Sequence, residues 1–196
     1  MIYEELISPE NLFRAWDQFK KGKLSKMDVL QFERHLEDNV FFLSNELLEQ
    51  AYRHRPYQTF RICDPKPRLI SKAGVRDRLI HHVIFDYLDN VFNATFIYHS
   101  YSSRLNKGTH LAIQNLNHSL RALSVNYTRP VYALKCDIKR FFHSINHQKL
   151  LNIIKSRVKD AQILWLLDEV ISSFPGSVGG GGVNGYTIKK YRITHW

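Results

Sequence analysis

The sequence predicts an α+β fold in which helices dominate and a β-hairpin interrupts them. Apolar residues recur every three or four positions in most of the chain, which is typical of amphipathic helices. Between Tyr57 and Ile70 the apolar spacing changes to two, which is typical of strands. With 44% apolar and 13% aromatic residues among 196, the chain has enough apolar surface for a packed core.

Two helices are predicted before residue 56. The first follows Ser8-Pro9, where serine caps the helix and proline takes its first position, and it ends at Gly22. The second begins at a capping box from Ser25 to Asp28 and extends to Ala51. We expect both helices to pack rather than to take part in chemistry.

The hairpin and the later elements follow from the same patterns. Asp64-Pro65-Lys66-Pro67 predicts a turn between two strands, with basic residues at its tip. Four later helices are expected over 79–91, 111–120, 147–158 and 161–173, with a strand that ends at Asp137. From residue 175 onward, glycines and a short basic, aromatic tail show no continuation of the core pattern.

The charge of the chain favours a polyanionic partner. Lys and Arg number 28 against 18 Asp and Glu, for a formal charge of +10, so nucleic acid is the first expectation and an anionic membrane surface the second. The two cysteines lack metal-ligand spacing and are too few for a disulfide framework, so we expect a cytoplasmic protein. The sequence has no long apolar span and no signal sequence, so we expect it to be soluble and not associated with a membrane.

Asp137 is the strongest candidate for a catalytic residue. It ends a short apolar run that predicts a buried strand, and two aromatic residues, Phe141 and Phe142, follow it. A carboxylate at such a position is costly to desolvate unless a cation or hydrogen-bond donors meet it. This pattern is typical of a metal ligand.

The segment Asp137-Ile138-Lys-Arg-Phe-Phe142-His-Ser-Ile145 resembles the first palm motif of reverse transcriptases. The resemblance implies that Asp137 is catalytic and that Asp137 and Ile138 hold the catalytic Mg2+. It also implies that Phe142 packs against the sugar of the incoming nucleotide and rejects a 2′-hydroxyl. The fold it implies is a helix-rich fingers region with a β-hairpin and the start of a right-hand polymerase palm.

Upstream segments are similar to the fingers motifs of the same family. These segments are Asp64 to Ile70 in the hairpin and, after it, Arg76-Asp77-Arg78. The resemblance implies that Lys66 and Arg68 are the cations that bind the dNTP. The alternative is an exposed hairpin whose charges only increase solubility. Arg76 and Arg78 either contact the template or form an internal ion-pair network at a helix start.

The segment from Ser100 to His110 resembles the Ser-Tyr-x-x-Arg-x-x-Lys-Gly-x-His segment of reverse transcriptases from diversity-generating retroelements and group II introns. The resemblance implies that Arg104, Lys107 and Gly108 bind template and primer. Gly108 would let the backbone approach a ligand closely. The alternative is an ordinary polar loop that caps the next helix.

The resemblance divides the chain into four consecutive segments: 1–56 as an N-terminal helical extension, 57–130 as fingers, 131–174 as a partial palm and 175–196 as an atypical tail. The later palm motifs, including the Tyr-x-Asp-Asp hairpin, do not occur in the sequence. Two-metal phosphoryl transfer needs carboxylates on both sides of the ions, so we expect Asp137 alone to be insufficient.

The resemblance therefore implies part of an RNA-directed DNA polymerase, which would use an RNA template, a DNA or RNA primer, dNTPs and Mg2+ in its intact form. This chain alone is expected to be inactive. One alternative is a non-catalytic RNA-binding module derived from a reverse transcriptase, and another is a basic helical scaffold for a protein partner.

The paired histidines His81-His82 and His143 with His147 lack the acid or cysteine that would complete a zinc site.

Overall fold

A computed structural model describes residues 2–138, 141–174 and 186–193. The chain divides into two compact units, and each contains two separate segments of sequence. Unit 1 comprises Met1–Val91 and Asn146–Gly176, and unit 2 comprises Phe92–Ile145 and Ser177–Trp196. The two units are therefore interleaved along the chain, whereas the sequence suggested four consecutive segments, whose functional assignment stays a prediction.

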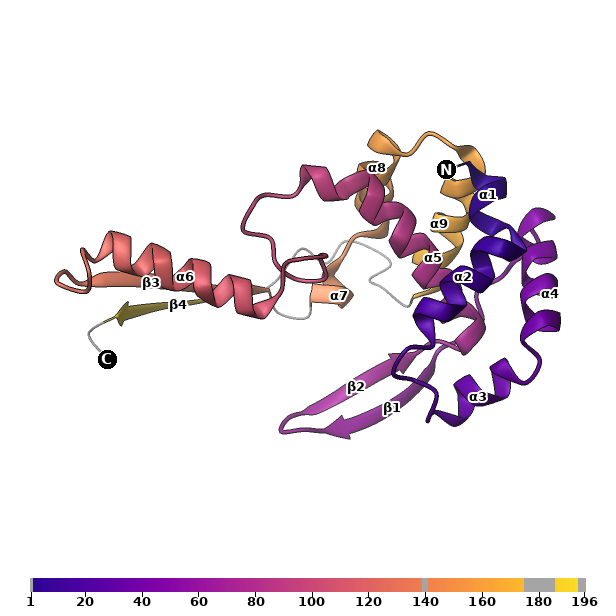
Figure 1. Ribbon diagram of the computed structural model, residues 1–196, viewed down its shortest axis with the longest axis horizontal. Helices are drawn as coiled ribbons and strands as arrows, with labels where there is room; N and C mark the ends of the chain where they lie inside the picture. The colour runs from indigo at the N-terminus through magenta and orange to yellow at the C-terminus, as the bar shows by residue number, and fades with distance from the viewer. Residues whose placement is uncertain (1, 139–140, 175–185, 194–196) are drawn as a thin grey trace. The chain divides into compact units, whose positions relative to one another are not determined.

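Unit 1 is mainly helical and carries one β-hairpin (Figure 1). Its elements are α1 (Tyr3–Ile7), α2 (Pro9–Phe19), α3 (Met27–Glu33), α4 (Leu36–Leu48), β1 (Gln58–Cys63), β2 (Pro67–Lys72), α5 (Val75–Phe92), α8 (His147–Arg157) and α9 (Ala161–Ser173). α2 begins as expected, because the Ser8 side chain accepts a hydrogen bond from the Asn11 amide at 3.2 Å.

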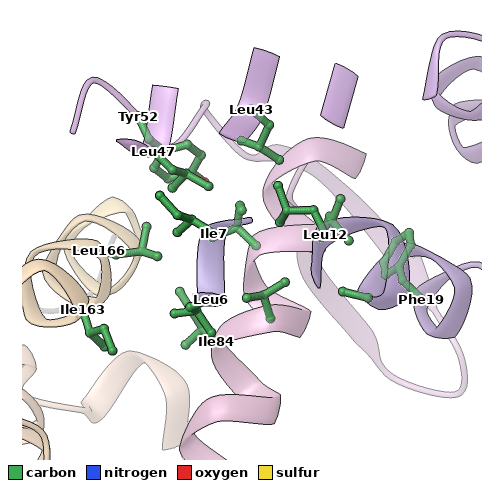
Figure 2. Packing of buried hydrophobic residues seen from close by; sticks show 14 of the residues in the cluster. Leu6, Ile7, Leu12, Phe19, Leu43, Leu47, Tyr52, Ile84, Ile163 and Leu166 are labelled. Carbon is green, nitrogen blue, oxygen red and sulfur yellow. The ribbon is translucent and has the colours of Figure 1, made fainter. Parts of the chain in front are cut away.

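A single apolar core joins the N-terminal helices of unit 1 to α5, α8 and α9 (Figure 2). Leu12 and Trp16 of α2 are fully buried, and Ile163 and Leu166 bring α9 into the same cluster. Polar bonds fix the packing as well, because the buried Tyr3 hydroxyl donates to the Leu47 carbonyl at 2.7 Å. The helices predicted after Ser8-Pro9 and over 79–91, 147–158 and 161–173 are thus confirmed as α2, α5, α8 and α9.

The predicted long second helix is wrong, because the structure divides it into α3 and α4. The break falls at Arg34 and His35, where His35 has a non-helical backbone (φ −124°, ψ 38°). The predicted capping box is also absent, since α3 begins after Lys26 without a side-chain cap. Asp28, the expected capping acid, instead binds Lys72 and Arg78.

The hairpin is confirmed, with β1 and β2 antiparallel and Gln58 opposite Lys72 at its open end. Every residue of β1 is exposed, and only the last part of β2 is partly buried. Its root is attached to the helices of unit 1, because the Asp28 carboxylate of α3 binds the Lys72 ammonium at 2.7 Å and the Arg78 guanidinium at 2.6 Å. The tip therefore extends from a fixed base.

Unit 2 contains one regular helix and a two-stranded ribbon in its described part. Its elements are the 3-10 turn η1 (Asn93–Thr95), α6 (Thr109–Leu123), β3 (Val131–Ile138), the one-turn α7 (Phe141–Ser144) and β4 (Tyr186–Ile193). β3 and β4 are antiparallel, with Asp137 opposite Thr187. No strand was expected at β4, and the glycine-rich stretch before it, 175–185, lies outside the described residues.

The expectation of a buried strand before Asp137 is wrong. β3 is present, but Leu134 is 63% exposed and no β3 residue is buried. α6 is likewise amphipathic and has no buried residue. A two-stranded ribbon leaves both of its faces open unless other elements cover them, so apolar composition alone did not determine burial here.

Candidate nucleic-acid interface

The hairpin presents its two predicted dNTP-binding cations to solvent. Lys66 lies at the tip and Arg68 lies in β2 opposite Ile62, and both are exposed. In the described part of the chain no carboxylate forms an ion pair with either side chain. The geometry is compatible with phosphate contacts, and that role stays a prediction.

Arg76 is enclosed by an internal network at the start of α5. Its guanidinium forms ion pairs with Glu46 and with Asp77, and lies over the Tyr52 ring at 4.5 Å from the ring centre. The Tyr52 hydroxyl donates to Asp77 at 2.8 Å. Burial and the Asp77 carboxylate raise the pKa of Tyr52, so its hydroxyl remains a donor.

Arg78 forms the second internal network through Asp28. Burial raises the pKa of the Asp28 carboxyl, but the Lys72 hydrogen bond and the Arg78 charge outweigh it and lower that pKa overall. Arg76 and Arg78 thus form the internal ion pairs that were one of the two alternatives expected from the sequence. Template contact by either residue stays a prediction, and nothing in these contacts favours it.

The loop from Phe96 to Gly108 in unit 2 is built around Arg104. The Arg104 guanidinium donates to the Asn93 side chain at 2.7 Å, to the Asn93 carbonyl at 3.1 Å and to the Ser100 carbonyl at 3.2 Å. Most of the N–H donors of the Arg104 guanidinium are therefore used in hydrogen bonds within this part of unit 2. Arg104 therefore shapes the loop whether or not it also contacts nucleic acid.

Lys107 and Gly108 complete this loop. The Lys107 ammonium lies 3.9 Å from the centre of the Tyr98 ring and donates to the Tyr98 carbonyl at 3.0 Å. Gly108 has φ +104°, a left-handed conformation that favours glycine, and directly precedes α6. Tyr98 itself is 63% exposed, so the loop presents an aromatic ring next to a cation.

Asp137 is the next-to-last residue of β3 and Ile138 is the last. Both side chains are exposed. Among the described residues, no group of three or more His, Cys, Asp or Glu side chains could hold a metal ion. Asp137 and Ile138 therefore supply at most part of a Mg2+ site, and the described residues do not fit a complete two-metal centre.

Phe141 and Phe142 follow on α7 with ring centres 5.5 Å apart at an interplanar angle of 66°. Phe142 is 70% exposed and is available for contact with a ligand. Phe141, the preceding ring, is 49% exposed. The sugar-selecting role of Phe142 stays a prediction.

Unit 1 also contains a histidine pair that was not expected from the sequence. His54 and His81 approach with 3.1 Å between their Nε2 atoms and with ring planes 10° apart. The ring centres are 5.1 Å apart, so the rings meet edge to edge through a hydrogen bond rather than face to face. The pair links residues 27 positions apart, and no local pattern in the sequence indicates it.

Positive charge is concentrated in unit 2. Its two segments contain ten Lys and Arg residues and one acid, Asp137, so they carry nine of the ten net positive charges of the chain. No Asp or Glu occurs between Asp89 and Asp137. This acid-free stretch is visible in the sequence, and its assignment to one compact unit comes from the structure.

The described helices do not include one that is long and apolar enough to cross a membrane. The fold is α+β, unit 2 carries most of the net positive charge, and unit 1 carries an exposed hairpin.

Comparison with known proteins relates the chain to proteins of introns. It is 26% identical over 187 residues to the "Uncharacterized 91 kDa protein in cob intron" of Schizosaccharomyces pombe, which covers 87% of this chain and 22% of that protein. It is 24% identical over 131 residues to the "Putative COX1/OXI3 intron 1 protein" of Saccharomyces cerevisiae, covering 66% of this chain and 15% of that protein.

A third relative, Protein YkfC of Escherichia coli, is 24% identical over 139 residues, covering 70% of this chain and 36% of YkfC. The chain thus spans about a third or less of the length of each of these relatives. No family model matches the chain. The similarity indicates an intron- or retroelement-related protein.

Proposed function

We propose that the chain is the template- and nucleotide-binding part of an RNA-directed DNA polymerase, a reverse transcriptase. The observation that carries the proposal is the order of its motifs: the basic hairpin, the Ser100–His110 segment and the Asp137 segment follow one another as in that family. The similarity to intron-encoded proteins and the basic unit 2 support it.

In this proposal the described residues bind and orient substrates. Lys66 and Arg68 contact the triphosphate of a dNTP, since both are exposed cations on one hairpin. The exposed Phe142 ring lies against the sugar and leaves no room for a 2′-hydroxyl. Lys107 and the backbone at Gly108 contact the template and primer, while Arg104 holds their loop in shape.

Mg2+ would neutralise the developing phosphate charge in the intact polymerase, with Asp137 and Ile138 as ligands from this chain. The remaining carboxylates are not among the described residues, so this part alone is expected not to extend a primer. A non-catalytic RNA-binding module derived from a reverse transcriptase is the second candidate, and the same basic residues of unit 2 would serve it.

The proposal is tested by measuring RNA binding and primer extension with the same preparation. We expect the chain to bind single-stranded RNA with an affinity that falls steeply as salt rises, because phosphate neutralisation releases counterions. Lys107→Ala should flatten the slope of log affinity against log salt by roughly 0.7 per lost contact. Lys149→Ala, an exposed lysine of α8 in unit 1, is the control and should change it less.

Arg104→Ala is a poor probe of contact because it also removes the hydrogen bonds that shape the loop. Negligible RNA binding at moderate salt would contradict the proposal and favour a protein-binding scaffold. With Mg2+, dNTPs and an RNA template, we expect no extension. Extension that Asp137→Ala abolishes would instead show that this chain is active by itself.

A further inference from the structure

One face of α6 has the composition of a nucleic-acid contact, and apart from His110, which ends the Ser100–His110 segment, its residues lie outside the motifs described above. His110, Gln114, Asn117, His118 and Arg121 are all exposed. At 3.6 residues per turn they lie within a sector of about 100° around the helix. All five side chains carry hydrogen-bond donors, and none is a carboxylate.

The opposite side of α6 is apolar and separate from this polar face. Leu116 and Leu123 are exposed there, and the exposed Ile113 lies at the flank between the two faces. A change on the polar face therefore leaves the apolar side chains in place. Within the described residues, no side-chain hydrogen bond or ion pair engages any of the five polar residues, so their donors are available to a ligand.

Charge complementarity identifies the occupant. α6 lies inside the acid-free stretch 90–136, in the unit that carries nine of the ten net charges. Arg, His, Asn and Gln side chains are the groups that commonly bind phosphate and sugar oxygens in nucleic-acid complexes. A solvated helix face without a ligand would be expected to include acids among its polar residues, because alternating charges stabilise exposed helices.

We infer that the polar face of α6 binds the sugar-phosphate backbone of an RNA strand, as a contact additional to the hairpin and the Phe96–Gly108 loop. This inference rests on the proposed RNA-binding function and extends it from the end of the Ser100–His110 segment to Gln114, Asn117, His118 and Arg121, which lie outside the family motifs. From His110 to Arg121 the face is about 16 Å long, so it can follow a strand over more than one nucleotide.

The test is a matched pair of triple substitutions in the full chain. Gln114→Glu, His118→Glu and Arg121→Glu change the polar face of α6 at positions i, i+4 and i+7. Gln148→Glu, Asn152→Glu and Lys155→Glu make the same change in net charge at the same spacing on exposed positions of α8. Both sets introduce the same like-charge pairs within one helix, so their intrinsic effects on helix stability are similar.

Single-stranded RNA binding is measured by fluorescence anisotropy at several salt concentrations, and helix content by circular dichroism. We expect the α6 set to weaken binding by about tenfold or more, and the α8 set by about threefold or less through net charge alone. Equal losses in the two sets, or no loss in the α6 set, would overturn the inference while RNA binding by the unchanged chain still upheld the proposed function.

A milder substitution keeps the test decisive if the α6 set lowers helix content. Arg121→Gln preserves helix propensity and should reduce the salt slope by roughly 0.7, whereas Lys155→Gln should leave it unchanged. An unaltered slope for Arg121→Gln would also overturn the inference. If the unchanged chain does not bind RNA, both the inference and the proposed function fail.

Discussion

At the residue scale, buried polar groups in unit 1 depend on one another. The fully buried Asp77 accepts hydrogen bonds from Tyr52 and Arg76, and Arg76 also binds Glu46. Removing one partner of such a group leaves a buried charge uncompensated, which costs more than the net contribution of the intact pair. These residues therefore act as a set that fixes α4, α5 and the segment around Tyr52.

His81 belongs to the same region and makes stability depend on pH. Burial, followed by the neighbouring His54, lowers the pKa of His81 from 6.5 to about 4. Two protonated imidazoles would place N–H groups against each other across the 3.1 Å contact. The unfolded chain takes up a proton near pH 6.5 that the folded chain accepts only near pH 4, so stability falls as pH decreases through this range.

We predict that His81→Gln, which removes the titrating group, makes the free energy of unfolding less dependent on pH. Between pH 7.5 and 4 the unchanged chain should lose about 2 to 3 kcal/mol more than the variant does. Urea denaturation at both pH values measures the difference. His110→Gln, at an exposed histidine, is the control; parallel pH curves for the unchanged chain and His81→Gln would contradict the prediction.

At the element scale, ion pairs determine how the hairpin is held. β1 and β2 bury almost none of their own residues, so the hairpin has little apolar stabilisation. Its root is held by Asp28, which the sequence suggested as a helix cap but which binds β2 and α5 instead. α3 consequently begins without a side-chain cap, and the hairpin gains a fixed attachment.

We predict that Asp28→Ala loosens the hairpin root. The two ion pairs are partly exposed, so the global cost should be only about 1 kcal/mol. The substitution should nevertheless increase the rate of amide hydrogen exchange in β1 and β2 more than it increases the rate in the core helices. Asp64→Ala, beyond β1 at the tip, is the control and should leave exchange at the root unchanged. Equal exchange in both variants would show that the ion pairs do not hold the hairpin.

At the scale of the whole molecule, the two units differ in both burial and charge. Unit 1 contains the apolar core and is nearly balanced in charge, whereas the described part of unit 2 buries almost no apolar side chain and is strongly basic. A helix such as α6, with 15 residues and none buried, is only marginally stable in water by itself. Stability should therefore be unevenly distributed along the chain.

We predict that hydrogen exchange separates the two units. Amides of α5 and α9 should be protected at least about a hundredfold more than those of α6. Exchange measured over a range of protein concentrations provides the control for self-association. Protection of α6 equal to that of α5, at every concentration, would show that its apolar side is covered in solution.

The sequence by itself determined the elements that have strong local signals. Apolar periodicity predicted α2, α5, α6, α8 and α9, and alternation with a proline turn predicted the hairpin, because these patterns act over a few residues. The motif segments and their order were likewise visible in the sequence, including the candidate site residues Lys66, Arg104, Lys107, Asp137 and Phe142.

Only the tertiary structure decided which of these side chains remain free to contact a ligand. Arg76, Arg78 and Arg104 resemble ligand-binding cations in the sequence. Arg76 and Arg78 instead bind the distant acids Glu46 and Asp28, and Arg104 donates to Asn93 and to carbonyls of its own loop. The His54–His81 pair and the grouping of α8 and α9 with the N-terminal helices also depend on residues far apart in the chain. β3 looked buried from its composition and is exposed, because burial depends on what packs against a strand and not on the strand itself.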